Sequence, residues 1–123
     1  MNKTERRGAP RIAQEIPLTL GDVGRELATQ TTNLSASGTY CALNRFIPAM
    51  TKLQVRLEVP DHPKSTSIIC QGVVVRVQPA HVVSKQARYH VAIFFSDLAD
   101  HDRATIARYV QQHLRTRSSQ HGS

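Results

Sequence analysis

The stretch Lys52-Leu53-Gln54-Val55-Arg56-Leu57-Glu58-Val59 alternates polar and apolar residues at every step. Successive side chains of a β-strand point to opposite faces, so this pattern predicts a strand with one face in a core and the other in water. A turn is predicted at Pro60-Asp61-His62-Pro63-Lys64, after which the stretch 67–77 has apolar residues on both faces. Such a strand is expected where a sheet closes into a barrel or is covered by a helix.

Four more short stretches have strand-like patterns and are separated from one another by turn residues. They cover residues 16–20, 26–34, 39–43 and 87–95. Residues suited to one packed helix face then recur at helical spacing, at Ile106, Tyr109, Val110, His113 and Leu114. The expected fold is therefore mainly β, a six-stranded antiparallel β-barrel with a C-terminal α-helix.

At 123 residues the chain suits a single domain with one core. Residues 1–15 are polar, basic and poor in apolar side chains, so we expect a flexible N-terminal arm that a bound ligand can order. Residues 16–116 form the expected barrel and helix, and residues 117–123 are expected to be a disordered tail.

The charge balance favours an anionic partner. Lys and Arg number 16 against 9 Asp and Glu, a formal net charge of +7. Cys41 and Cys70 stand alone in apolar, strand-like stretches, which predicts small core residues in a reduced, cytoplasmic protein. No apolar run approaches the roughly 18 to 20 residues that a membrane span needs, so we expect no membrane partner.

Several chemistries lack the residue patterns that they need. The six histidines show no paired metal-ligand spacing, so no metal site and no cofactor are expected. No Ser-His-Asp set or phosphate-binding loop is present, and the sequence does not predict an enzyme.

Two stretches are equipped to bind an anion with polar planar edges. Arg6-Arg7-Gly8-Ala9-Pro10-Arg11 carries three guanidinium groups, which pair with phosphate oxygens or with the O6 and N7 acceptors of guanine. Asn33-Leu34-Ser35-Ala36-Ser37-Gly38, expected to be the loop between two strands, offers an amide, a hydroxyl and a flexible glycine. Ordinary turn chemistry is an alternative role for Asn33, Ser35 and Gly38.

The spacing Arg7-x-x-x-Arg11 followed by Asn33-x-Ser35-x-x-Gly38 resembles the two-part signature of the PilZ domain, a bacterial receptor module for cyclic di-GMP. The resemblance extends over nearly the whole chain and implies the same barrel-plus-helix fold. It also implies that Arg7 and Arg11 each clamp a phosphate or a guanine edge. Asn33 and Ser35 would then hydrogen-bond a second guanine region, and Gly38 would permit close contact.

Arg6 directly precedes this pattern, and the resemblance implies that a basic residue there accompanies a stacked pair of ligands, whereas an apolar one accompanies a single ligand. Two stacked molecules bring four phosphate charges together, and a third guanidinium offsets their repulsion. We therefore expect two cyclic di-GMP molecules per chain. The expected output is an adapter whose changed surface regulates a separate protein partner of unknown identity.

Two other functions fit part of the sequence. A small basic barrel can bind nucleic acid, but such barrels add exposed aromatic platforms. Here Tyr89, Phe94 and Phe95 fall in a strand expected to be core and only Phe46 falls in a loop, which disfavours nucleic acid. The other function is a PilZ-like protein-interaction module independent of nucleotide, against which the complete signature argues.

Overall fold

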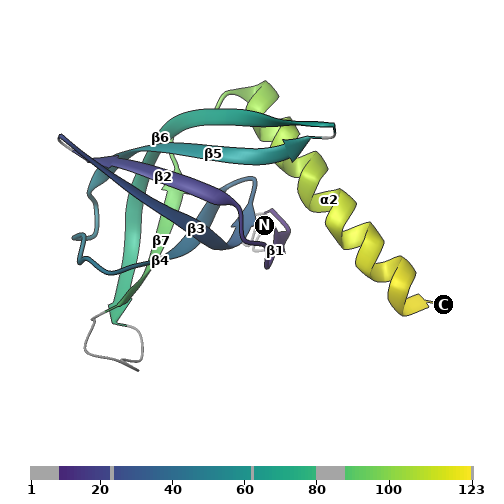
Figure 1. Cartoon of the computed structure of the whole chain (residues 1–123), viewed down its shortest axis with the longest axis horizontal. Helices are drawn as coiled ribbons and strands as arrows, with labels where there is room; N and C mark the ends of the chain where they lie inside the picture. The colour runs from purple at the N-terminus through teal and green to yellow at the C-terminus, as the bar shows by residue number, and fades with distance from the viewer. Residues whose placement is uncertain (1–8, 23, 62, 80–87, 123) are drawn as a thin grey trace, which may run out of the picture.

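The computed structural model describes residues 9–22, 24–61, 63–79 and 88–122, with side chains described as far as residue 116. In this part of the chain seven strands form one antiparallel sheet and a helix follows it (Figure 1). The elements are β1 (Arg11–Ile12), β2 (Pro17–Asp22), β3 (Arg25–Ser35), β4 (Gly38–Leu43), β5 (Lys52–Asp61), β6 (Lys64–Pro79), β7 (Tyr89–Phe95) and α2 (Asp100–Gly122).

The sheet closes on itself. Its strands follow in the order β1-β3-β2-β5-β6-β7-β4, and a further pairing between β3 and β4 completes a ring of six strands. The short strand β1 lies outside this ring, where it pairs with the end of β3 beyond β2. The expected mainly β fold, a six-stranded antiparallel barrel with a C-terminal helix, is confirmed.

The alternating stretch forms β5 and fills the barrel as predicted. Its apolar side chains are each at most 2% exposed and are Leu53, Val55, Leu57 and Val59. Strand β6 pairs with β5 along its first half, which places Ile68 opposite Leu57 and Cys70 opposite Val55. Burying apolar side chains of this size from both strands is the main contribution to the stability of the barrel.

Strand β7 follows the predicted alternation, with one correction. Val91, Ile93 and Phe95 face the core and are at most 2% exposed, and Tyr89 is partly buried against it. Phe94, however, is 49% exposed. The expectation that Phe94 is a core residue is wrong, because neighbours in a strand point to opposite faces of the sheet.

Both cysteines are free and buried, which confirms that they are small core residues. Burial raises the pKa of the Cys41 thiol to about 12. Burial also raises the pKa of Cys70 to about 11, and the nearby carboxylates of Asp97 and Asp102 add to this effect. Both thiols are therefore protonated at neutral pH.

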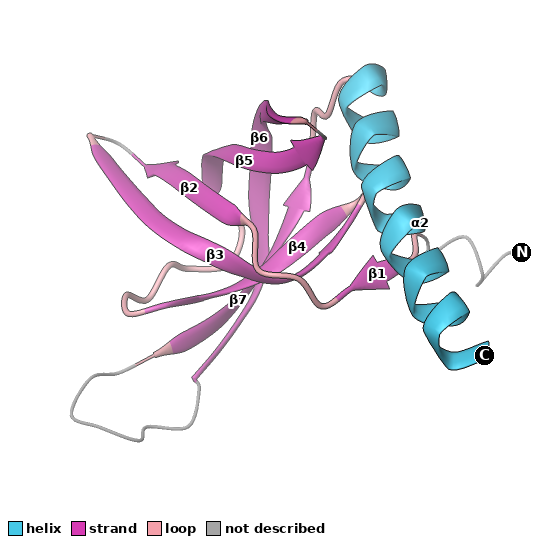
Figure 2. Ribbon diagram, turned by 45° about the vertical axis from the view of Figure 1, so that its right-hand side comes forward, coloured by secondary structure: helices cyan, strands magenta, loops and turns pink. Residues whose placement is uncertain are grey.

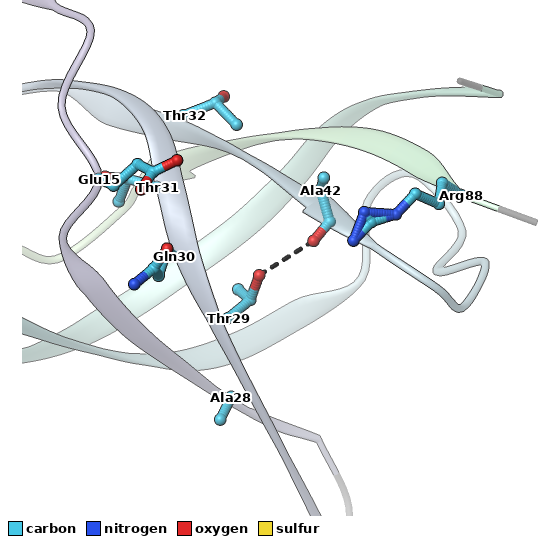
Figure 3. Close-up of a pocket in the computed structure, with 8 residues that line it drawn as sticks. All are labelled: Glu15, Ala28, Thr29, Gln30, Thr31, Thr32, Ala42 and Arg88. Carbon is cyan, nitrogen blue, oxygen red and sulfur yellow. Dashed lines mark hydrogen bonds between the residues drawn. The ribbon is translucent and has the colours of Figure 1, made fainter. Parts of the chain in front are cut away.

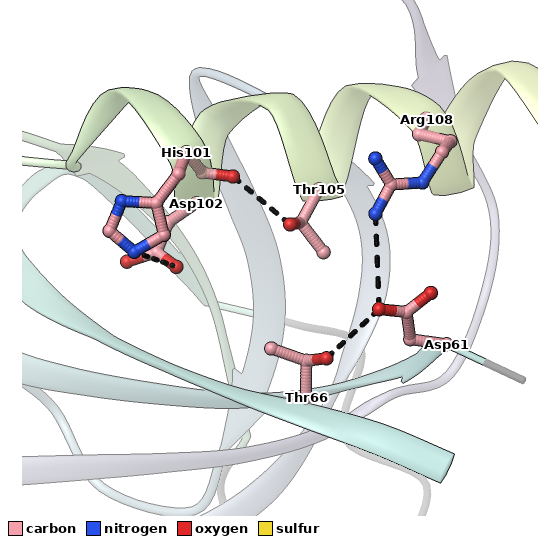
Figure 4. A network of polar contacts seen from close by, with 6 residues as sticks. All are labelled: Asp61, Thr66, His101, Asp102, Thr105 and Arg108. Carbon is pink, nitrogen blue, oxygen red and sulfur yellow. Dashed lines mark hydrogen bonds and ion pairs between the residues drawn. The ribbon is translucent and has the colours of Figure 1, made fainter. Parts of the chain in front are cut away.

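Helix α2 contacts β1, β3 and β5, and it runs along the end of the barrel beside β1 (Figure 2). Ile106, Tyr109 and Val110 form its buried face, at the helical spacing predicted from the sequence. A polar contact supplements this packing: the Arg108 guanidinium lies 3.8 Å from the Asp61 carboxylate, which also accepts a hydrogen bond from the Thr66 hydroxyl (Figure 4). No helix in the described part of the chain is long and apolar enough to cross a membrane.

Two boundaries differ from those expected. Helix α2 continues to Gly122, whereas residues 117–123 were expected to be a disordered tail. Neither glycine nor proline interrupts the chain between Leu114 and Gly122, so the backbone meets no residue that breaks a helix. The expected arm covers residues 1–15, but its residues Arg11 and Ile12 already belong to the sheet. They pair with β3, and Ile12 is 3% exposed.

Candidate functional site

Three neighbouring strands bring residues of the two signature stretches together. Strand β1 lies on one side of the end of β3, and β4 lies on the other. Arg11 of β1 is paired with Ser35 of β3, and Asn33 of β3 is paired with Tyr40 of β4. Because Leu34 between these positions points into the core, Asn33 and its cross-strand neighbours lie on the outer face.

The Arg11 guanidinium is the centre of this face. Its Nη1 donates a hydrogen bond of 2.6 Å to Oδ1 of Asn33. Its Cζ lies 4.9 Å from the centroid of the Tyr40 ring, within the range of a cation–π contact. The two halves of the signature are therefore in direct contact through Arg11 and Asn33.

Ser35 is fully buried, and its hydroxyl is used within the chain. The Ser37 backbone N–H donates to Ser35 Oγ at 3.1 Å, and the hydroxyls of Ser35 and Ser37 lie 3.0 Å apart. Ser35 thus fixes the two-residue connection to β4, as expected from the turn chemistry of serine.

Gly38 is needed for a close approach between strands. A Cβ atom placed on Gly38 would collide with the carbonyl oxygen of Ile93 and would lie 3.3 Å from Cα of Phe94. Gly38 is paired with Phe94 at the start of β4, so a larger residue would push β4 away from β7. This is a packing requirement and does not involve the backbone freedom of a turn.

The expectation that residues 33–38 form a loop is wrong for most of the segment. Strand β3 extends through Ser35 and β4 begins at Gly38, so only Ala36 and Ser37 connect the two strands. The pairing of β3 with both β1 and β4 keeps Asn33 to Ser35 in an extended conformation. Asn33 is accordingly held on a strand, which is a more rigid position than a loop.

The helix also reaches the signature. Arg103 of α2 donates a hydrogen bond from Nη1 to the carbonyl oxygen of Ala36, at 3.0 Å. Ala36 lies between Ser35 and Gly38, so the helix directly contacts the connection that follows Asn33.

Arg6 and Arg7 lie outside the described residues, so the site as seen here contains the signature from Arg11 onward. Ala9 is the first described residue and packs partly buried against the core. Within the described residues, the first stretch of the signature therefore reaches the site through β1.

An open groove of about 540 Å³ lies beside the signature rather than on it (Figure 3). It forms where β3 and β4 separate, and the Thr29 hydroxyl donates to the carbonyl oxygen of Ala42 across the gap. Its lining residues are Glu15, Ala28, Thr29, Gln30, Thr31, Thr32, Ala42 and Arg88. None of the four predicted site residues that the structure describes, Arg11, Asn33, Ser35 and Gly38, is among them.

Two residues of the site were not predicted from the sequence. Tyr40 lies two positions after Gly38, and its pairing with Asn33 would have followed from the strand alternation if residues 33–35 had been assigned to β3. Arg103 has no such signal, because an arginine on the first turns of a helix usually lies in solvent.

The sequence matches the family model of the PilZ domain over residues 5–112, which is most of the chain. The chain belongs to the PilZ domain family. No curated protein is similar enough to count as a relative of this PilZ domain. Its fold is shared with solved structures of low sequence identity.

The Bacillus subtilis inhibitor of motility MotI/DgrA has a TM-score of 0.78 at 18% identity, covering 90% of this chain and 52% of that protein. The PilZ domain of YcgR from Escherichia coli, solved with c-di-GMP, has a TM-score of 0.70 at 11% identity, covering 96% of this chain and 98% of that one. PlzA from Borreliella burgdorferi, also in complex with c-di-GMP, has a TM-score of 0.64 at 9% identity, covering 92% of this chain and 54% of that one. This PilZ domain therefore spans about half the length of the motility inhibitor.

Proposed function

We propose that this PilZ domain is a receptor for cyclic di-GMP and that it regulates a separate protein by changing its surface when the ligand binds. The observation that carries the proposal is the contact between Arg11 and Asn33, which joins the two halves of the signature on one exposed face. Family membership supports it, as do the YcgR and PlzA structures, which were solved with this ligand.

Each signature residue has a role in this proposal. Arg6, Arg7 and Arg11 bind phosphates or guanine edges, because a guanidinium presents several N–H donors in a fixed plane. The Asn33 amide both donates and accepts, which suits the edge of a guanine. Ser35 and Gly38 support the site by holding the strands in place: Ser35 fixes the connection between β3 and β4, and Gly38 lets β4 approach β7 closely.

The number of ligands bound per chain is expected to depend on the arginines of residues 1–15. We propose that Arg6, beside Arg7, allows a second cyclic di-GMP to stack on the first, giving two molecules per chain.

We also propose that the receptor is cytoplasmic. Cys41 and Cys70 are free thiols, which fits a reducing compartment.

Isothermal titration of the purified chain with cyclic di-GMP tests the proposal, with GTP and single-stranded DNA as competing ligands. The expected result is saturable binding of cyclic di-GMP only. Arg11→Ala should raise the dissociation constant by roughly tenfold or more, because it removes one charge-assisted hydrogen bond to the ligand. The matched control is Arg56→Ala, since Arg56 is an exposed arginine on β5, on another part of the barrel. Binding of DNA in place of the dinucleotide would overturn the receptor assignment.

A further inference from the structure

Tyr40 contacts the one signature arginine that the structure describes. Its ring lies under the Arg11 guanidinium, with 4.9 Å between Cζ and the ring centroid. Asn33, directly opposite Tyr40 on the neighbouring strand, accepts a hydrogen bond from the edge of the same guanidinium at 2.6 Å. The guanidinium is thus held at its edge by an amide and on its face by an aromatic ring.

Arg11 needs such support because of where it lies. Strand β1 has only two residues and lies outside the closed ring, and the Arg11 side chain is exposed. A free arginine side chain has roughly 2 kcal/mol of rotamer entropy, part of which is lost when a ligand fixes the guanidinium. Contacts that already hold the group reduce this loss and so strengthen binding.

The Tyr40 ring is separate from the barrel core. Its neighbours in β4, Thr39 and Cys41, point inward and are at most 1% exposed, whereas Tyr40 is half-buried on the outer face. Removing the ring therefore leaves the inner packing of β4 in place. An effect on ligand binding can then be distinguished from a loss of the fold.

We propose that Tyr40 is a positioning residue of the ligand site: its ring holds the Arg11 guanidinium in the orientation in which it meets cyclic di-GMP. This inference rests on the proposed function and adds a residue that lies outside the two-part signature. The ring face is the part that matters, because it carries the negative charge density that attracts a cation.

Two substitutions distinguish the effect of the aromatic ring on ligand binding from the effect of its volume. Tyr40→Phe keeps the aromatic face, so its dissociation constant for cyclic di-GMP should stay within roughly twofold of wild type. Tyr40→Leu keeps an apolar side chain but removes the face, and should weaken binding roughly three- to tenfold. Tyr89→Leu is the control, because Tyr89 is the first residue of β7, is paired with Leu43 at the end of β4 distant from Tyr40, and packs against Phe46.

A double-mutant cycle shows whether Tyr40 acts through Arg11. In an Arg11→Ala background, Tyr40→Leu should change the dissociation constant no further. Equal losses in the two backgrounds, or wild-type affinity in Tyr40→Leu, would overturn the proposal while leaving the receptor function standing.

The contact itself is measurable without ligand. The Nε–Hε resonance of Arg11 should be shifted upfield by the Tyr40 ring in wild type and in Tyr40→Phe, and should lose this shift in Tyr40→Leu. An unshifted resonance in wild type contradicts the positioning role. If the wild-type chain does not bind cyclic di-GMP at all, the proposed function fails, and the role of Tyr40 fails with it.

Discussion

Arg103 of helix α2 donates a hydrogen bond to the backbone carbonyl of Ala36, the residue that follows the last position of β3. The same short connection is held from inside the sheet by Ser35, whose hydroxyl accepts from the Ser37 N–H. Helix α2 therefore contacts the connection Ala36–Ser37, which directly follows the strand that carries Asn33. A change in the conformation of this connection would change its contact with α2.

Arg103→Ala should loosen this connection. The lost hydrogen bond lowers the free energy of unfolding by about 0.5 to 1.5 kcal/mol. The amides of Ser37 and Phe95 should exchange faster with solvent, because the Phe95 N–H donates to the Ser37 carbonyl. Hydrogen exchange followed by NMR measures both sites.

Arg108→Ala is the matched control on the same helix. Arg108 lies 3.8 Å from Asp61, and both side chains are about half exposed, so this pair contributes at most about 1 kcal/mol. It also contacts the β5–β6 hairpin and not the connection after β3. Faster exchange of Ser37 in Arg108→Ala, equal to that in Arg103→Ala, would show that the Arg103 contact is not specific.

Gly38→Ala should affect the fold more than the ligand. The added Cβ would meet the Ile93 carbonyl, and such overpacking costs about 1 to 3 kcal/mol. Gly21→Ala in β2 is the control, because its nearest neighbour would be Cβ of Gln54 at an ordinary 3.6 Å. There the change should stabilise the strand by about 0.5 kcal/mol. Urea unfolding of both variants decides the matter, and equal midpoints would contradict the close approach of β4 to β7.

Much of the fold could be predicted because it depends on local alternation. The polar–apolar pattern from Lys52 to Val59 defines β5, and the helical spacing of Ile106, Tyr109 and Val110 defines the buried face of α2. These patterns hold wherever a strand or helix covers a core. The barrel itself is favoured by the apolar residues on both faces of 67–77 and by the resemblance to the PilZ domain.

The remaining features depend on partners far away in the sequence. Strand β1 is too short to show a periodicity, and Arg11–Ile12 becomes a strand only by pairing with β3. The same pairing converts Asn33 to Ser35 from an expected loop into the end of a strand. The signature implies that Arg11 and Asn33 contact the same ligand, but their direct hydrogen bond and the part played by Tyr40 require knowledge of this register.

Asn33 can be tested by two substitutions of different chemistry. Asn33→Ala removes the acceptor for Arg11 and should weaken cyclic di-GMP binding by about 1 kcal/mol or more, roughly five- to tenfold. Asn33→Asp keeps an oxygen acceptor at the same place and adds a charge that strengthens its hydrogen bond to Arg11. This variant should retain binding. Calorimetric titration that finds the two variants equally impaired would remove the Arg11–Asn33 contact from the site.

The buried thiols predict a loss of stability at alkaline pH. An exposed thiol in the unfolded chain has a pKa near 9.0, whereas burial raises the pKa of Cys41 in the folded chain to about 12. Above pH 9 the unfolded state therefore binds fewer protons than the folded state, and the free energy of unfolding falls as pH rises. Below pH 8 both states are protonated and this contribution is constant.

Urea unfolding under reducing conditions at pH 7.5 and pH 10 measures this effect. Cys41→Ala lowers stability at both values by removing a buried side chain, but its decrease between the two should be smaller than that of wild type. Cys70 titrates in the same direction and remains in both proteins, so it cancels in the comparison. Identical decreases in the two proteins would contradict the raised pKa of Cys41.

The charge at position 6 should set the number of bound ligands. Two stacked cyclic di-GMP molecules carry four phosphate charges, whose repulsion falls when a third guanidinium joins those of Arg7 and Arg11. We expect two ligands per chain in wild type and a ratio approaching one in Arg6→Leu, because leucine offers neither charge nor donors. Arg6→Lys keeps the charge without the planar fork and should give an intermediate ratio. Titration at known active protein concentration measures the ratio directly. A wild-type ratio of one would exclude the stacked pair and leave a receptor that binds a single dinucleotide.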